Sequence, residues 1–429
     1  MSLATEDAPT ANAVEAPVSG RLRAESLSES VAILLVLLVA QRLVGFVRSV
    51  LFCRWLSPEQ LGAWDMAFGF LMFAAPLAVL GLPGSFGRYV EYYRQRGQLK
   101  TYLRRTTVAT LALGLVAVGV MLAAPAWIAE IVFGDAAWQN LMPPLTAALA
   151  AAVVYNLLTS LFIALRRNRV LSLMQFLASI VFAALGLGLI WHTPDARHVI
   201  AAFAGSYVVS TVVALIWLKA LWKVLPACDS TLPQRSMWTR LMPFALGLWT
   251  TNWLSSMFEI ADRFLLIQYS GIKSEAALDL VGQYHSARLV PMLMVSMAEL
   301  LAAIITPHLS SDWEAGRRRR VGHRLGFMLK LFALAATAGS ATFLIVAPAL
   351  FQFAFANKYA SGEAVLPCTL LYCVWTSLAA IGFNYLWCAE RSRLVTTTLG
   401  LGLSLNIVLN LLLLPAWGLW GAVISTTIA

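Results

Sequence analysis

The chain consists of long apolar runs separated by short polar loops. A membrane-spanning helix needs about 20 consecutive apolar residues, and eleven segments of this 429-residue chain meet that requirement. We place the spans at 31–53, 61–83, 106–133, 141–165, 170–191, 198–220, 241–268, 281–306, 326–351, 364–387 and 394–414. A twelfth apolar run begins at Gly418 and reaches the last residue after twelve positions, which we interpret as a truncated helix. The pattern predicts an all-α integral membrane protein with about twelve transmembrane helices.

Composition agrees with that pattern. The chain is 60% hydrophobic and 12% charged, whereas soluble domains average about 25% charged residues. The segment 1–30 is rich in Ala, Ser, Pro and Glu, which predicts a disordered tail. A soluble protein is therefore excluded.

The basic residues predict the orientation of the spans. With the N-terminus in the cytoplasm, 22 of the 31 Lys and Arg residues fall in the tail and the cytoplasmic loops, and only four fall in the outer loops. Cytoplasmic loops of membrane proteins carry such an excess of positive charge. This rule also accounts for the net charge of +10, so we expect no nucleic-acid partner.

A short motif repeats between the two halves of the chain. Gly62-x-Trp64-x-x-Ala67 opens the second span, and Gly282-x-Tyr284-x-x-Ala287 opens the eighth, 220 residues later. Parallel repeats of this kind place a transporter's substrate between two lobes. We therefore predict a six-helix lobe over 31–223, a linker over 224–240 and a second six-helix lobe over 241–429, its last helix incomplete.

Four arginines lie inside the predicted spans: Arg42, Arg48, Arg263 and Arg288. A charged side chain near the bilayer centre costs about 2.5–3.5 kcal/mol on insertion scales, and arginine is well shaped to bind phosphate. The four residues predict a cationic cavity that binds an anionic substrate. The alternative for Arg48, beside Arg54, and for Arg288 is an anchor at the membrane interface.

Acidic and titratable residues accompany these arginines. We predict that they tune the arginine charges or couple transport to an ion gradient: Asp65, Glu259, Asp262, His285 and Glu299. Asp65 either neutralises Arg42 or Arg48 or takes up a proton and frees an arginine, and His285 is its counterpart in the repeat. Glu259 and Arg263 have the i, i+4 spacing of an intrahelical ion pair.

Other functional classes find little support. No loop between spans exceeds about 25 residues, so we expect no catalytic domain, and neither a phosphate-binding loop nor a metal-ligand cluster occurs. We therefore predict that the protein is not an enzyme and uses no cofactor or metal. Four aromatic residues are candidates to stack on sugar rings, although such residues also line membrane interfaces: Trp64, Trp249, Trp253 and Tyr284.

Several segments resemble one transporter family. RWLSPEQLGAWDMAFGFL, LGLPGSFGRYVEYY, VGQYHSARL, FANKYASGEAVLPCTLLY, LWCAERSR and N-x-x-LNLLLLPAWGLWGAVIST occur in its order over most of the chain. They resemble the polysaccharide-transporter family of O-antigen and exopolysaccharide flippases, within the multidrug/oligosaccharidyl-lipid/polysaccharide exporter superfamily. The resemblance implies a V-shaped pair of six-helix lobes around a central cavity. QRLVGFVRSV is also similar to the first span of lipid II flippases.

The resemblance implies that an undecaprenyl-type lipid-linked oligosaccharide moves from the cytoplasmic to the outer leaflet of a bacterial inner membrane. Expected partners are membrane lipids and the polysaccharide polymerase and export machinery. The alternatives are an ion-coupled multidrug antiporter on the same fold, a lipid II-type flippase, and a scaffold that recruits glycan-assembly enzymes without transporting.

Overall fold

The computed structural model describes residues 27–224, 232–389 and 391–429, and these residues form helices and connecting turns without a strand. The predicted tail 1–30 lies almost entirely outside the described residues. The helices are α1 (Leu27–Trp55), α2 (Pro58–Ala78), η1 (Pro83–Ser85), α3 (Phe86–Gln95), α4 (Leu99–Ala123), α5 (Pro125–Phe133), η2 (Ala136–Leu141), α6 (Met142–Ala164), α7 (Asn168–His192), α8 (Ala196–Val224), α9 (Gln234–Tyr269), α10 (Ser274–Arg288), α11 (Pro291–Glu314), α12 (Arg318–Ala349), η3 (Leu350–Ala354), α13 (Ala360–Cys388), α14 (Ser392–Trp417) and α15 (Leu419–Ile428).

Nine helical stretches of the described chain are long and apolar enough to cross a membrane. Helix α9 lies outside these nine stretches and carries Glu259, Asp262 and Arg263 along its length. The chain is therefore a multi-pass membrane protein.

Proline and glycine determine where several helices begin and end. Ser57 caps α2 by accepting a hydrogen bond from the backbone N–H of Gln60, and Pro58 occupies the first helical turn. The predicted span 281–306 is two helices, because α10 ends at Arg288 and α11 begins at Pro291. Proline disfavours a helical conformation in the residue before it and has no N–H to donate.

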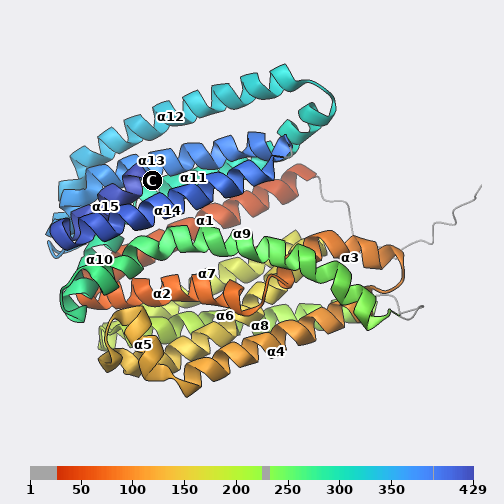
Figure 1. Ribbon diagram of the computed structural model, residues 1–429, viewed down its shortest axis with the longest axis horizontal. Helices are drawn as coiled ribbons and strands as arrows, with labels where there is room; N and C mark the ends of the chain where they lie inside the picture. The colour runs from red at the N-terminus through yellow and green to blue at the C-terminus, as the bar shows by residue number, and fades with distance from the viewer. Residues whose placement is uncertain (1–26, 225–231, 390) are drawn as a thin grey trace, which may run out of the picture.

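The helices form two lobes. In the first lobe α1 packs on α7, and α8 packs on both α6 and α7; in the second, α9 packs on α14, α13 on α11 and α12, and α14 on α15 (Figure 1). Successive spans run antiparallel, so the loops gather at two ends. We name them the Ser57 end (loops around 57, 134, 194, 271 and 357) and the Arg166 end (loops around 97, 166 and 316 and the start of α14). Helix α9 begins at Gln234, within the predicted linker 224–240.

The two lobes meet where α2 crosses α10, near the Ser57 end. A Cβ atom built on Gly62 would lie 1.8 Å from the carbonyl oxygen of Leu278, and one built on Gly282 would lie 1.9 Å from that of Pro58. Real Cβ contacts are never this short, so only glycine permits such a close approach of the two backbones. The glycines of the repeated motif thus meet each other at the lobe interface.

Polar contacts close the same end between α1 and the start of α13. Arg54 donates to the carbonyl oxygen of Phe353 at 2.6 Å, and Lys358 donates to that of Arg54 at 2.7 Å. The hydroxyl of Tyr359 donates to the carbonyl oxygen of Cys53 at 3.0 Å. Lys358 and Tyr359 thereby bind carbonyls left free at the end of α1, and Arg54 binds η3. The lobes are therefore joined at the Ser57 end.

Candidate transport cavity

A cavity of about 480 Å³ lies between the two lobes. Its walls come from α1, α2, α6, α7 and α8 of the first lobe and from α9, α10 and α11 of the second. Seven of the nine predicted site residues line it: Arg42, Arg48, Asp65, Glu259, Arg263, His285 and Arg288. The contacts of Gly62 and Gly282 lie on the same helices but nearer the Ser57 end, so they separate the cavity from that end.

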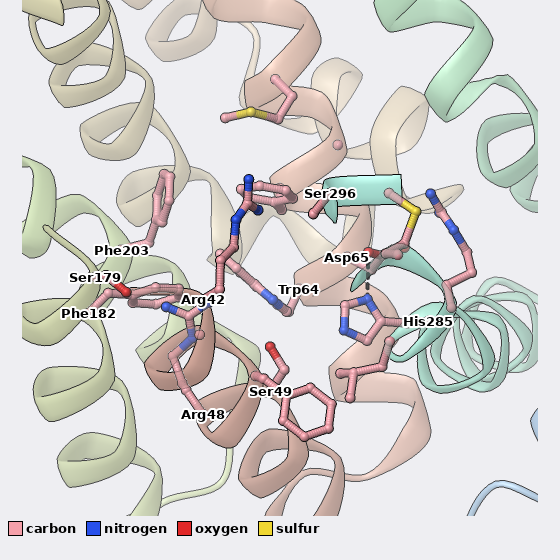
Figure 2. Close-up of a pocket in the computed structure, with 18 of the residues that line it drawn as sticks. Arg42, Arg48, Ser49, Trp64, Asp65, Ser179, Phe182, Phe203, His285 and Ser296 are labelled. Carbon is pink, nitrogen blue, oxygen red and sulfur yellow. Dashed lines mark hydrogen bonds and ion pairs between the residues drawn. The ribbon is translucent and has the colours of Figure 1, made fainter. Parts of the chain in front are cut away.

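Arg42 and Arg48 project from α1 without a carboxylate partner. Within the described part of the chain, no ion pair joins either residue to an Asp or Glu. The guanidinium of Arg48 lies 4.1 Å from the ring centroid of Phe182 (Figure 2), and no described residue hydrogen-bonds to its Nε. A cation held over an aromatic face keeps its N–H donors available. Arg48 thus faces the cavity, whereas Arg54 lies at the Ser57 end.

Arg263 is held by Asp65 of the opposite lobe. Its Nη1 lies 2.9 Å from Oδ2 of Asp65, and both side chains are about 95% buried. Its Nη2 donates to the main-chain carbonyl oxygen of Glu259 at 2.7 Å. Two sequence-based alternatives are therefore wrong: Asp65 pairs with neither arginine of α1, and Arg263 pairs with Asp65 rather than with the Glu259 carboxylate.

His285 also binds Asp65. Its Nδ1 lies 2.7 Å from Oδ1 of Asp65, and Figure 2 shows the ring beside that carboxylate with its other edge toward the open cavity. A carboxylate can only accept a hydrogen bond, so Nδ1 carries the proton. The two counterparts of the sequence repeat, 220 residues apart, are thus in direct contact across the lobe interface.

The remaining predicted residues lie at the edge of the cavity or outside it. Arg288 lines the cavity but is buried, 5.2 Å from the ring of Tyr284. Asp262 is buried behind the cavity, where it accepts from the backbone N–H of Arg263 at 2.8 Å. Glu299 lines a different cavity, of about 1090 Å³, inside the second lobe. The predicted set is therefore not one cluster.

Comparison with known proteins places the chain in a family. Residues 27–311 match the model of the family described as polysaccharide biosynthesis protein. The chain belongs to this family. A matching curated relative is the uncharacterized membrane protein MJ1068 of Methanocaldococcus jannaschii, 25% identical over 167 residues, which cover 38% of this chain and 32% of that protein. The chain thus spans about a third of that relative.

Two solved structures share the fold of this polysaccharide biosynthesis family member. The inward closed conformation of the lipid II flippase MurJ has a TM-score of 0.71 and 12% identity, covering 92% of this chain and 84% of MurJ. An inward-facing multidrug resistance MATE transporter of the MOP superfamily has a TM-score of 0.69 and 16% identity, covering 90% of both chains. The chain has the V-shaped two-lobe fold of these two membrane transporters.

Three aromatic residues on the first-lobe wall of the cavity were not predicted from the sequence. Tyr155 of α6 and Tyr207 of α8 stack with ring centroids 4.0 Å apart, and Phe203 lies 4.4 Å from Tyr207; all three line the cavity beside Trp64. Tyrosines inside otherwise apolar spans were the available signal. Of the other predicted aromatic residues, Trp249 donates to the carbonyl oxygen of Leu77, outside the cavity.

The family member therefore has a cavity of mixed chemistry. Arg42 and Arg48 offer guanidinium donors that form no ion pair with a carboxylate of the described residues, and aromatic rings and hydroxyls stand on the first-lobe wall beside them. Arg263 and His285 share Asp65 on the opposite wall. Such a cavity can bind an anion together with a polar group that has an apolar face.

Proposed function

We propose that this member of the polysaccharide biosynthesis protein family is a flippase. It moves a lipid-(pyro)phosphate-linked oligosaccharide from the cytoplasmic to the outer leaflet for polysaccharide export, by alternating access of the cavity between its lobes. The observation that carries the proposal is the unpaired state of Arg42 and Arg48 in that cavity. Guanidinium groups bind phosphate oxygens with paired, charge-assisted hydrogen bonds.

The rest of the ligand matches the rest of the cavity. The first sugars lie against the aromatic wall of Trp64, Tyr155, Tyr207 and Phe203, and the polyprenyl tail stays in the bilayer. Because the loops at the Arg166 end carry most of the basic residues, that end faces the cytoplasm. The contacts at the Ser57 end then close the outer side, so the lipid-linked sugar enters from the cytoplasmic leaflet.

Two alternatives share the fold. A lipid II-type flippase is supported by the similarity to MurJ and by the pair of arginines on the first helix. A multidrug antiporter is supported by the similarity to the MATE transporter, but a cationic drug would need an available carboxylate. Asp65 is occupied by Arg263 and His285. Glu259 is the other carboxylate in the lining, against the four arginines Arg42, Arg48, Arg263 and Arg288, so an anionic substrate fits this cavity better.

The test is flipping of a defined probe in vesicles that contain the full chain. The probe is a fluorescent undecaprenyl-pyrophosphate disaccharide, and its arrival in the opposite leaflet is followed by quenching with a membrane-impermeant reductant. We expect Arg42→Ala and Arg48→Ala each to slow flipping about 10–100-fold, the effect of losing one charge-assisted hydrogen-bonding group worth about 1.5–3 kcal/mol.

The matched control is Arg319→Ala, which removes an exposed arginine at the Arg166 end and should leave flipping unchanged. All variants are first shown to insert at wild-type levels. Normal flipping by the Arg42→Ala/Arg48→Ala double variant would contradict the proposal. Lipid II and ethidium, used as probes in parallel, distinguish the two alternatives.

A further inference from the structure

We infer that His285 binds the proton that couples transport: its Nε2 takes up H⁺, and the resulting imidazolium holds the second lobe to Asp65 of the first. The role of this proton in transport rests on the proposed function, whereas the proton site itself stands on the geometry. The step is a simple protonation, in which the Nε2 lone pair accepts H⁺ from water and later returns it, and no other bond forms or breaks.

The geometry leaves one nitrogen of the ring open. Nδ1 of His285 already donates to Asp65 at 2.7 Å, and no described residue forms a hydrogen bond with Nε2. The His285 side chain is 22% exposed, against 6% for Asp65, so water in the cavity reaches the imidazole more readily than the carboxylate. Histidine is also the side chain that changes charge between pH 5 and 8 in its ordinary state.

Asp65 itself is a poor proton acceptor in this arrangement. Its Oδ2 lies 2.9 Å from Nη1 of Arg263 and its Oδ1 lies 2.7 Å from His285, so both oxygens are engaged by donors. Protonating the carboxylate would remove the nearer of the two negative charges beside the buried Arg263, leaving it only Asp262, whose Oδ1 lies 3.8 Å from Nε, which is costly. Of the two residues, His285 is therefore the one to which we assign the proton.

The surroundings of His285 contain charges of both signs. Besides Asp65 and Arg263, the charged or titratable side chains that line the cavity or pack beside it are Arg42, Arg48 and Cys53 of α1, Tyr155 and Tyr207 of the first lobe, Glu259 and Asp262 of α9, Tyr284 and Arg288 of α10, and Tyr372 and Cys373 of α13. Only Asp65 is in contact with the imidazole as a hydrogen-bonded carboxylate. The proton therefore acts chiefly on that one contact.

That contact crosses the lobe interface, so its strength depends on conformation. Asp65 lies three residues beyond Gly62 on α2, and His285 lies three residues beyond Gly282 on α10. Separation of the lobes at the Ser57 end must part α2 from α10 and break the pair. An imidazolium–carboxylate pair is stronger than the neutral hydrogen bond. His285 therefore binds a proton more tightly when the Ser57 end is closed than when it is open. Protonation in turn shifts the population toward the closed conformation.

The test measures closure of the Ser57 end directly, without any saccharide. Spin labels are attached to Gln139→Cys on η2 and Ser361→Cys on α13, exposed positions on opposite lobes, in the full chain with its native cysteines replaced by alanine, in lipid nanodiscs. Distance distributions are recorded by pulsed electron resonance at pH 6 and pH 8. We expect the ratio of closed to open populations to rise on the order of tenfold at pH 6 relative to pH 8, because the charge-assisted pair with Asp65 forms only in the closed state.

Two substitutions should abolish the effect of pH on the spin-label distances, and one should leave that effect unchanged. His285→Gln retains a neutral donor to Asp65 but cannot take up a proton, and Asp65→Asn offers the imidazolium no ion pair, so both distributions should be the same at the two pH values. His308→Gln, at an exposed position on α11, should respond like the wild type. An unchanged pH response in His285→Gln, or no response in the wild type, would overturn the inference.

The flipping assay separates this failure from failure of the proposed function. If the spin-label distances do not change with pH and Arg42→Ala flips slowly, the proton site is overturned and the proposed flippase function is retained. Distances that respond to pH, together with normal flipping by the double arginine variant, overturn the flippase and leave a proton-sensitive lobe contact.

Discussion

At the residue scale, one buried carboxylate of this molecule is neutralised across the lobe interface. Asp65 of α2 is shared by Arg263 of α9 and His285 of α10, and each of these residues is far from Asp65 in the sequence. The exposed pair Glu91–Arg94, by contrast, is an i, i+3 pair along one helix. A pair whose members belong to different lobes contributes to the relative position of those lobes as well as to stability.

Removing one member of the buried pair should destabilise the protein. Asp65→Ala removes the nearer carboxylate from the buried Arg263 and leaves Asp262 at 3.8 Å; because loss of one member of a buried pair costs up to about 3–5 kcal/mol, the Tm in detergent should fall. Asp65→Ala/Arg263→Met removes both charges and should recover much of that loss. Glu91→Ala, in the exposed pair, should have little effect. A double variant no more stable than Asp65→Ala would contradict this account of the pair.

The sequence predicted which residues would be polar inside the membrane but not all of their partners. Arg42, Arg48 and Arg263 line the cavity as their depth in the spans indicated. The partner of Arg263 depended on how two lobes pack, which local spacing does not report, and the i, i+4 rule therefore selected Glu259 wrongly. Glu299 has the same type of signal as the others, yet its helix α11 presents it to the second cavity.

At the element scale, the crossing of α2 and α10 fixes the lobe contact. The apolar pattern places α2, predicted at 61–83, and the prolines explain where helices begin: Pro58 starts α2 and Pro291 starts α11. The predicted continuous span 281–306 was wrong because a break before Pro291 was not allowed for. The short distance between α2 and α10 could not be predicted. The sequence shows that the glycine recurs in both motifs, but it does not show that the two glycines pack against each other.

Adding a methyl group where α2 crosses α10 should weaken the packing of these two helices. In Gly62→Ala the new methyl group would meet the backbone of Leu278 at 1.8 Å, so α2 and α10 must move apart, at a cost of about 1–3 kcal/mol for overpacking. We expect a lower Tm for Gly62→Ala and for Gly282→Ala. Gly326→Ala on α12 serves as control, because a methyl group there meets nothing within 4 Å and should be neutral or slightly stabilising. Equal Tm values for all three variants would show that the crossing is not tightly packed.

At the scale of the whole molecule, helix direction and charge together predict which end faces the cytoplasm. The loops at the Arg166 end carry most of the lysines and arginines of the chain, and the loops at the Ser57 end carry four. The fold gathers these loops at two opposite ends, as the alternation of spans required. The count is a property of the complete set of loops, so it predicts orientation without reference to any one contact.

That orientation predicts which single cysteines a membrane-impermeant maleimide will reach in intact spheroplasts. With the native cysteines replaced by alanine, Gln139→Cys at the Ser57 end should be labelled from outside. Arg319→Cys at the Arg166 end should be labelled only after the membrane is permeabilised; both positions are exposed, so membrane sidedness is what distinguishes them. The reverse pattern would place the Ser57 end in the cytoplasm. The closed contacts of α2 with α10 would then shut the cytoplasmic side of the cavity, and a flippase in this conformation would be awaiting release of its lipid-linked sugar rather than its entry.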